Sequence, residues 1–385
     1  MSVRSVGYTA PFPQETYLTR LSALPGCSLF LGPSSDCEWL TGAPRLANDP
    51  GFDADPGVAM TACFIGPRGV VFSVGHSQWA LEAGSVMALW AVHEFAGGDA
   101  AEHFRQVAEM AGWIEGPVYV APATEFRQVE LLRRAFPASE LRVADFVTPL
   151  RSLKSEAEID LLRKAARLTA GAIRDACGEL RNGISRLDLL AAVERQLLAA
   201  GVDRVVYGPD IWAIGPAISV DWSSPATLYA DPVLIPPCSV SLDVGVSFRG
   251  YRADVGRTIF IGGVPPRSAE ALDTLREARR VGVAALRPGR RAEEVDAITR
   301  SLIVERGFGA GFWIPSGHGI GLEIHEAPIL RAGDRTVFQA GNVVNFELAI
   351  WQDGVAGAFA EDTVVIRDDG PEWLIDDGDQ PVVVE

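Results

Sequence analysis

Two acidic strand pairs in the C-terminal half constrain the fold more than any other feature of this chain. Residues 239–261 (SVSLDVGVSFRGYRADVGRTIFI) have the pattern of two strands joined by a turn at Phe248-Arg249-Gly250. If the hairpin is centred between Phe248 and Arg249, Asp243 lies directly opposite Asp254. Opposed residues have Cβ atoms about 5 Å apart on one face, so two carboxylates there repel each other unless a cation lies between them.

A second hairpin repeats this arrangement. Residues 342–351 and 357–366 flank a turn over residues 352–354, and centring the hairpin on Gly354 places Glu347 opposite Glu361. A glutamate in so apolar a strand is unfavourable to bury without a partner, and a metal ion is a suitable partner. Either pair alone could also be two surface carboxylates on a sheet. Two pairs that are both in cross-strand register favour the metal site.

The third feature is a glycine-marked segment, residues 316–328 (SGHGIGLEIHEAP), which holds His318 and His325. His318 lies between two glycines, whose bare backbone allows another group to approach closely. A phosphate-binding loop is the competing interpretation, but the segment lacks the G-x-x-x-x-G-K-[ST] pattern. Oxygen ligands with one imidazole suit Mn, Co, Fe or Zn better than Ca.

These features predict a site for two divalent metal ions, with Mn expected first and Co, Zn or Fe as alternatives. Four carboxylates balance the charge of two such ions, which would polarise a scissile carbonyl and lower the pKa of a shared water. The expected activity is hydrolysis of an amide or other C–N bond by a metal-bridged hydroxide. The predicted ligands are Asp243, Asp254, His318, Glu347 and Glu361.

The sequence resembles the creatinase/prolidase/methionine aminopeptidase family, which has the pita-bread fold. The order Asp, Asp, His, Glu, Glu is that family's ligand order, and GHGIGLEIHEAP is the most specific match. Residues 17–21 (YLTRL) and 39–42 (WLTG) are similar to the N-terminal domain of its Xaa-Pro peptidase and creatinase branch. Residues 151–159 (RSLKSEAEI) resemble the start of its catalytic domain.

The resemblance implies a metal-dependent hydrolase of the Xaa-Pro aminopeptidase or dipeptidase type. Glu347 would be both a metal ligand and the proton-handling carboxylate beside the bridging water. His325 would lie near the substrate and stabilise the tetrahedral intermediate. The N-terminal domain would help to form a homodimer that closes over the active site.

Three positions depart from the family pattern. No histidine occurs from residue 151 to 317, and the segment that usually carries one contains Asp221 and Trp222 instead, which we expect to contact substrate. His76 or His93 of a second subunit is a candidate replacement. The usual Glu-Pro-Gly is Glu347-Leu348-Ala349 here, and Phe359-Ala360 stands where an arginine is usual.

These departures leave three hypotheses open. The first is a peptidase that cleaves the bond before proline. The second is an enzyme of the same fold that acts on a small non-peptide substrate as a C–N hydrolase or lyase, with Trp222 and Trp351 lining an aromatic pocket. The third is a binding protein that has lost catalysis, against which the five retained ligands argue.

Hydrophobic periodicity predicts two domains, residues 1–150 with an α/β pattern and residues 151–385 with an α+β pattern. In the first domain, strands are expected at 27–31, 58–65, 69–73 and 117–121, and a helix at 103–111. Helices of the second are expected at 158–177, 187–200, 269–286 and 292–306, packed on an antiparallel sheet. The order helix, helix, hairpin occurs twice there, which indicates an internal pseudo-duplication.

Composition excludes several other classes of protein. The formal net charge of −16 makes a nucleic-acid-binding role a poor fit, because affinity for phosphate backbones depends on lysine and arginine. The five cysteines are scattered without a C-x-x-C pair, which indicates free thiols in a reducing compartment. No apolar run reaches the length of about 18 residues that a membrane span needs, so we expect a cytoplasmic protein without a membrane partner.

Overall fold

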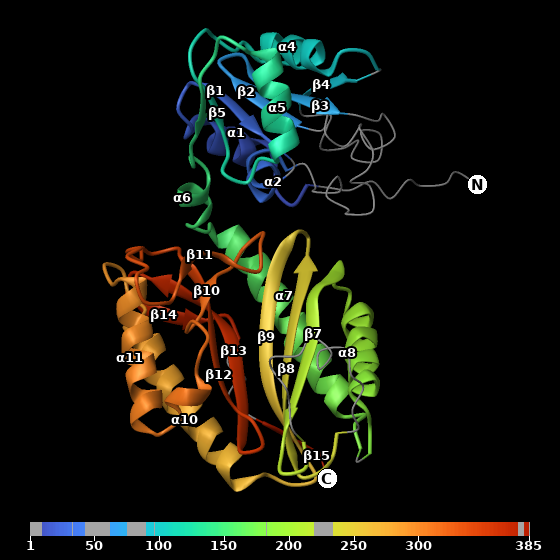
Figure 1. Ribbon diagram of the computed structural model, residues 1–385, viewed down its shortest axis with the longest axis vertical. Coiled ribbons are helices and arrows are strands. Elements are labelled where there is room, and N and C mark those ends of the chain that lie inside the picture. The colour runs from blue at the N-terminus through green and yellow to red at the C-terminus, as the bar shows by residue number, and fades with distance from the viewer. Residues whose placement is uncertain are drawn as a thin grey trace, which may run out of the picture. The chain divides into compact units, whose positions relative to one another are not determined.

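The structure is a computed structural model that describes residues 10–32, 34–42, 62–74, 90–95, 97–181, 183–218, 234–375 and 381–384. The chain divides into two compact units, Met1–Arg151 and Ser152–Glu385. Figure 1 shows the elements of both units.

The first unit is a mixed sheet of six strands in the order β4-β3-β2-β1-β5-β6. Its core is an aromatic and aliphatic cluster in which Phe30, Phe64 and Phe104 contact one another. The sheet strands are β1 (Ser28–Leu31), β2 (Ala62–Gly66), β3 (Gly69–Val74), β4 (Ala91–Glu94), β5 (Val118–Val120) and β6 (Leu141–Val143). The helices are α1 (Gln14–Ser22), α2 (Ser35–Thr41), α4 (Ala100–Ala111), α5 (Phe126–Ala135) and α6 (Thr148–Arg151).

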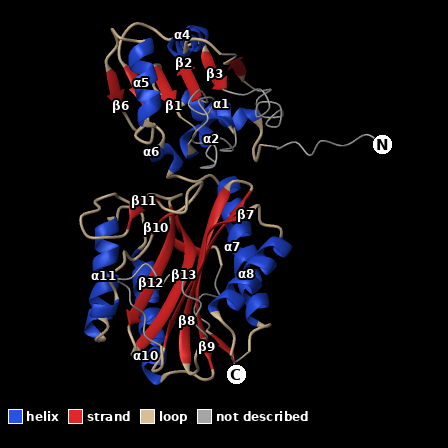
Figure 2. Ribbon diagram, turned by 45° about the vertical axis from the view of Figure 1, so that its right-hand side comes forward, coloured by secondary structure: helices blue, strands red, loops and turns tan. Residues whose placement is uncertain are grey.

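The second unit has a nine-stranded sheet, with the main order β11-β10-β12-β13-β9-β8-β7, β14 beside β13, and β15 beside β9. Figure 1 labels these strands, and Figure 2 shows the strands in red and the helices in blue. The central strands are long and antiparallel. The strands are β7 (Arg204–Ile214), β8 (Cys238–Phe248), β9 (Tyr251–Ile261), β10 (His318–Gly319), β11 (Glu326–Ile329), β12 (Val343–Gln352), β13 (Ala356–Arg367), β14 (Gly370–Trp373) and β15 (Val382–Val384). The predicted α+β architecture, with helices packed on an antiparallel sheet, is confirmed for this unit.

Four long helices pack on this sheet in two pairs. They are α7 (Glu156–Cys177), α8 (Arg186–Ala200), α10 (Pro266–Ala285) and α11 (Ala292–Glu305), and a short 3₁₀ helix follows at Gly309–Gly311. Ser155 is the N-cap residue of α7, and its backbone N–H and hydroxyl both donate to Glu158 Oε2, at 2.8 and 2.7 Å. Each helix pair precedes one long hairpin, β8–β9 or β12–β13, and the two hairpins meet where β9 pairs with β13. The predicted helix-helix-hairpin repeat is therefore present.

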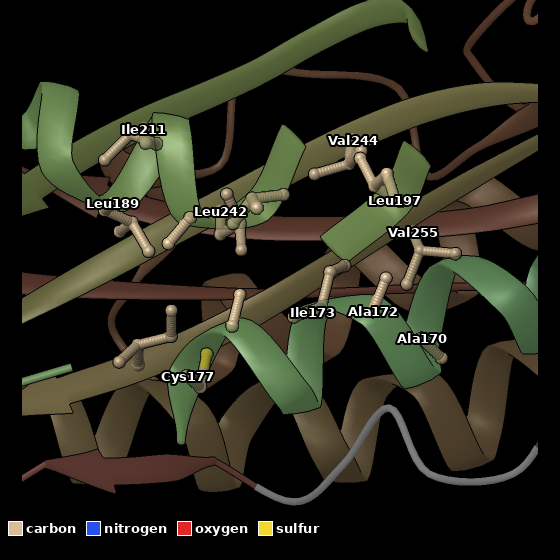
Figure 3. Packing of buried hydrophobic residues seen from close by; sticks show 14 of the residues in the cluster. Ala170, Ala172, Ile173, Cys177, Leu189, Leu197, Ile211, Leu242, Val244 and Val255 are labelled. Carbon is tan, nitrogen blue, oxygen red and sulfur yellow. The ribbon is translucent and has the colours of Figure 1, made fainter. Parts of the chain in front are cut away.

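The alternation of residues along the strands separates an apolar face from a polar one. In β8, Val240, Leu242 and Val244 belong to the core cluster that α7 and α8 form with the sheet (Figure 3). The intervening residues of β8 are Ser239, Ser241, Asp243, Gly245 and Ser247. All ten residues from Cys238 to Ser247 are buried, including those that face away from the helices. A buried polar face on a central strand needs a partner for its charge.

Candidate metal centre

A row of acidic residues crosses the polar face of the second unit's sheet. Asp243 in β8 lies opposite Gly256 in β9, Gly256 pairs with Glu361 in β13, and Glu361 lies opposite Glu347 in β12. Asp254 is two residues from Gly256 and shares its face. Four carboxylates that are far apart in the sequence are thereby brought together on one side of the sheet.

The predicted register of the first hairpin is wrong by two residues. Phe248 pairs with Tyr251, so the turn consists of Arg249 and Gly250, both with positive φ, at 51° and 86°. Such a two-residue turn matches the twist of an antiparallel pair. Asp254 consequently lies opposite Gly245, and Asp243 and Asp254 are diagonal neighbours. Because side chains alternate with a period of two, an error of two residues keeps both carboxylates on the same face.

The predicted register of the second hairpin is confirmed. Glu347 and Glu361 are direct cross-strand partners, and the strands turn around Gly354, whose φ is 63°. The side chains differ in exposure, since that of Glu361 is 1% exposed and that of Glu347 is 18% exposed. Glu347 is therefore the more open of these two carboxylates.

His318 points its Nε2 atom at this group. The atom lies 3.9 Å from Asp254 Oδ2, 3.9 Å from Glu347 Oε2 and 3.9 Å from Glu361 Oε1. The other ring nitrogen, Nδ1, donates to the Gly319 carbonyl at 3.0 Å. Because a carbonyl oxygen only accepts, this bond leaves the Nε2 lone pair available, which is the tautomer that a metal ligand requires.

Strand β10 reaches this position because Gly317 has no side chain. The φ of Gly317 is 142°, and a Cβ atom on it would lie 2.2 Å from the Asn345 carbonyl oxygen of β12. Gly317 thus permits the close approach of β10 to β12, and Gly319 permits that of β11, because a Cβ atom on it would lie 2.4 Å from the Ala327 carbonyl oxygen.

The buried atoms of the group fit a cation. Four of them have no hydrogen-bond partner among the described residues, namely Asp243 Oδ1, Asp254 Oδ1, Glu361 Oε2 and His318 Nε2. Their residues are at most 5% exposed. Unpaired buried acceptors are strongly unfavourable, and divalent cations bound among them would satisfy them.

Three sets of three side chains offer ligand atoms within 4.8 Å of one another. Glu361 belongs to two of these sets. The sets are Asp243 with Asp254 and Glu361, His318 with Glu347 and Glu361, and Asp254 with His318 and His325. Each of the five predicted ligands therefore belongs to at least one such set, and so does His325.

The electrostatics of the group point the same way. Burial, reinforced by the Asp254 charge, raises the pKa of Glu347 to about 8, and burial raises the pKa of Asp254 to about 7. Burial and the neighbouring carboxylates also raise the pKa values of Asp243 and Glu361. Burial lowers the pKa of His318 to about 4, so its imidazole is neutral. Without a cation, the four carboxylates favour their protonated, neutral forms. A bound divalent cation would lower their pKa values and favour the ionised forms.

His325 lies at the exposed edge of the group. Its ring centroid is 4.3 Å from that of His318 and 6.5 Å from that of Tyr207. The loop that carries His325 is fastened by a buried ion pair, in which Lys154 Nζ lies 2.9 Å from Glu326 Oε2 and both side chains are 2% exposed. This pair joins the start of α7 to the residue that follows His325.

Several residues of the site were missed in the sequence. Asp210 of β7 lies opposite Asp243, and its charge contributes to the raised pKa of Asp243. Lys154 is one of only two lysines, and Glu326 follows His325 directly. The sequence therefore contains a weak indication of the ion pair between Lys154 and Glu326. Asn345 also lies in the group. Of the predicted substrate residues, Asp221 and Trp222 lie outside the described residues, as does His76.

The other candidate residues of the sequence lie elsewhere in the two units. His93 lies in β4 with its ring centroid 4.8 Å from that of His103, and His103 is buried with its Nε2 atom 2.8 Å from Ser73 Oγ. Trp351 is 5% exposed and packs against Trp212, Trp313 and Phe359. Phe359, at the position where the family pattern has an arginine, is part of this buried aromatic cluster.

A family model described as metallopeptidase family M24 matches residues 160–368, which hold all five predicted ligands. The chain belongs to metallopeptidase family M24. As an M24 protein it is a metal-dependent hydrolase, and the resemblance inferred from the ligand order is confirmed.

Relatives and solved structures agree with this assignment. The M24 chain is 28% identical over 276 residues to a Xaa-Pro dipeptidase of Pyrococcus horikoshii, covering 71% of this chain and 77% of the relative. It is 30% identical to an uncharacterised peptidase of Staphylococcus saprophyticus, covering 64% and 69%. The structure of a Xaa-Pro dipeptidase from Bacillus anthracis matches with a TM-score of 0.81 and 21% identity, covering 96% of this chain and 100% of the other.

One further structure is closer in sequence. Dipeptidase PepE from Mycobacterium ulcerans matches with a TM-score of 0.80 and 26% identity, covering 97% of this chain and 99% of the other. Both structural matches extend over the two units of the M24 chain, so the first unit belongs to the shared architecture as well.

Proposed function

We propose that this M24 protein is a dinuclear-metal peptidase that hydrolyses the bond before proline in short peptides. The observation that carries the proposal is the convergence of four carboxylates and the His318 Nε2 atom on one buried face, with four acceptor atoms left without described partners. Relatives that share most of the chain are named Xaa-Pro dipeptidases, which supports the substrate class. They do not favour the alternative of a small non-peptide substrate.

Asp243, Asp254, His318, Glu347 and Glu361 would hold the metal ions. When bound, two divalent ions would polarise the scissile carbonyl and make water acidic enough to attack it at neutral pH. Glu347 would accept the proton of the attacking water and pass it to the leaving nitrogen, because its side chain is open enough to meet substrate. His325, exposed beside His318, would donate a hydrogen bond to the oxygen on which negative charge develops.

The finer assignments belong to the same proposal. We expect Mn as the metal, since oxygen ligands dominate the set. Residues 151–385 would be the catalytic domain, and residues 1–150 would be the N-terminal domain that supports a homodimer. The five free cysteines suit the reducing conditions of the cytoplasm. Among the described residues, no helix has the length and apolar character of a membrane span.

The deciding experiment is release of free amino acid from a panel of Xaa-Pro dipeptides and tripeptides. The Mn-loaded protein is compared with a chelated sample and with the Asp254→Ala variant. We expect release that depends on both Mn and Asp254. If the wild-type protein binds Mn but releases nothing from any peptide, the peptidase proposal is wrong and the non-peptide alternative regains its place.

A further inference from the structure

A buried amide beside the metal centre holds one of the carboxylates. Asn345 of β12 is fully buried, and its Nδ2 atom donates to Glu361 Oε1 at 2.5 Å. Its position follows from the register, because Asn345 lies opposite Thr363 on β13 and opposite His318 on β10. Asn345 thus lies between the strand of the imidazole and the strand of the carboxylate.

The Thr363 hydroxyl and the Glu361 carboxylate hold the two ends of that amide. An ionised carboxylate only accepts, so the NH₂ end of Asn345 faces Glu361. The Thr363 hydroxyl, which can donate or accept, then donates to Asn345 Oδ1 at 2.9 Å. Thr363, Asn345 and Glu361 form one directed chain of hydrogen bonds.

The chain determines which oxygen atoms of Glu361 remain available. Oε1, held by Asn345, lies 3.9 Å from His318 Nε2, while Oε2 has no partner among the described residues. Glu361 is also the carboxylate shared by two of the three candidate ligand sets. A carboxylate that serves two metal ions must present its oxygens in one fixed rotamer. A neutral amide provides this restraint without adding a fifth negative charge.

We propose that Asn345, oriented by Thr363, is a positioning residue that fixes Glu361 for metal binding. This inference rests on the proposed ligand set. Partners of metal ligands in the outer shell typically change metal affinity by about 10- to 100-fold when they are removed. The restraint acts on the Glu361 oxygen nearest His318, so the ion held by His318, Glu347 and Glu361 should be affected most.

The test measures metal binding, not turnover alone. Calorimetric titration with Mn²⁺ is run on the wild-type protein and on Asn345→Leu, which keeps the branching of the side chain and removes the donor. We expect Mn²⁺ to bind at least about tenfold more weakly to one of two sites in the variant. The visible spectrum of the Co²⁺-loaded protein should change as well, because it reports the geometry of the ligands.

Two further variants separate positioning from general stability. Thr363→Val is isosteric and should weaken Mn²⁺ binding in the same direction by releasing the amide. Asn342→Leu removes a buried amide whose Nδ2 donates to the Ser152 carbonyl, away from the ligands, so it should lower the thermal midpoint and leave Mn²⁺ affinity unchanged.

The possible results are distinguishable. If the wild-type protein binds no Mn²⁺, the proposed metal site itself fails. If it binds two ions and Asn345→Leu binds them equally well, the positioning role is wrong. If Asn345→Leu does not fold, Thr363→Val decides, and unchanged Mn²⁺ affinity in that variant overturns the proposal.

Discussion

At the scale of single residues, the geometry of the metal centre depends on a glycine, Gly256, because no other residue fits at its position. Gly256 lies between Asp243 and Glu361 in the row that crosses the sheet. A Cβ atom on Gly256 would lie 2.2 Å from Phe359 Cε1 and 2.7 Å from Glu361 Cβ. Neither neighbour has room to move, because Phe359 is fully buried and Glu361 is 1% exposed.

We therefore expect Gly256→Ala to displace Glu361 and to abolish or severely weaken Mn²⁺ binding. Overpacking of this kind lowers the free energy of unfolding by about 1–3 kcal/mol. Gly171 is the matched control, since it lies inside α7 with nothing within 4 Å of its added Cβ. Gly171→Ala should be neutral or stabilise the helix by up to about 1 kcal/mol. Urea unfolding and Mn²⁺ titration measure both effects, and tight binding by Gly256→Ala would contradict this account.

A second prediction concerns the buried ion pair behind His325. Lys154→Met leaves the Glu326 carboxylate buried without its ammonium partner, which costs about 3–5 kcal/mol in comparable cases. Because Glu326 adjoins His325, kcat should fall as well. The exposed pair of Arg290 and Glu294 is the control, and Arg290→Ala should change stability by less than about 1 kcal/mol. Equal losses in the two variants, measured by urea unfolding, would show that the buried pair has no special role.

At the scale of secondary-structure elements, the sequence predicted the long helices and both carboxylate hairpins, because each has a strong periodic pattern. The register of the second hairpin was predictable since Gly354 marks its turn. The register of the first hairpin was not predictable, because Arg249 adopts a left-handed backbone conformation. Arginine rarely adopts this conformation, so the sequence does not indicate a turn centred there. The roles of Asn345 and Asp210 were invisible for another reason. Each depends on strand neighbours that only the sheet order determines.

The turn of the first hairpin allows a direct test of this explanation. At φ of 51°, Arg249 pays a conformational penalty that asparagine largely avoids, and Asn-Gly is the preferred pair for such a turn. Arg249→Asn should therefore raise the free energy of unfolding, by about 0.5–1 kcal/mol, without altering Mn²⁺ affinity. Gly250→Ala, at φ of 86°, should act in the opposite direction. If Arg249→Asn destabilises the protein, the assigned turn and the corrected register are both in doubt.

At the scale of the whole molecule, each unit has its own hydrophobic core, and all five predicted ligands lie in the second. The acidic face of that unit holds buried carboxylate oxygens that have no hydrogen-bond partner among the described residues. Its carboxylates are buried together, and their pKa values are raised by that burial. Metal ions would therefore contribute to the stability of the second unit as well as to catalysis.

This coupling predicts how chelation changes unfolding. A ligand present at 100 times its Kd adds about 2.7 kcal/mol to the stability of the folded state that binds it. In scanning calorimetry, removing metal with a chelator should lower the transition of the second unit and leave that of the first in place. Asp254→Ala should lose the response to Mn²⁺ altogether. If the chelator shifts both transitions equally, the two units unfold as one cooperative structure, and metal binding stabilises the whole chain.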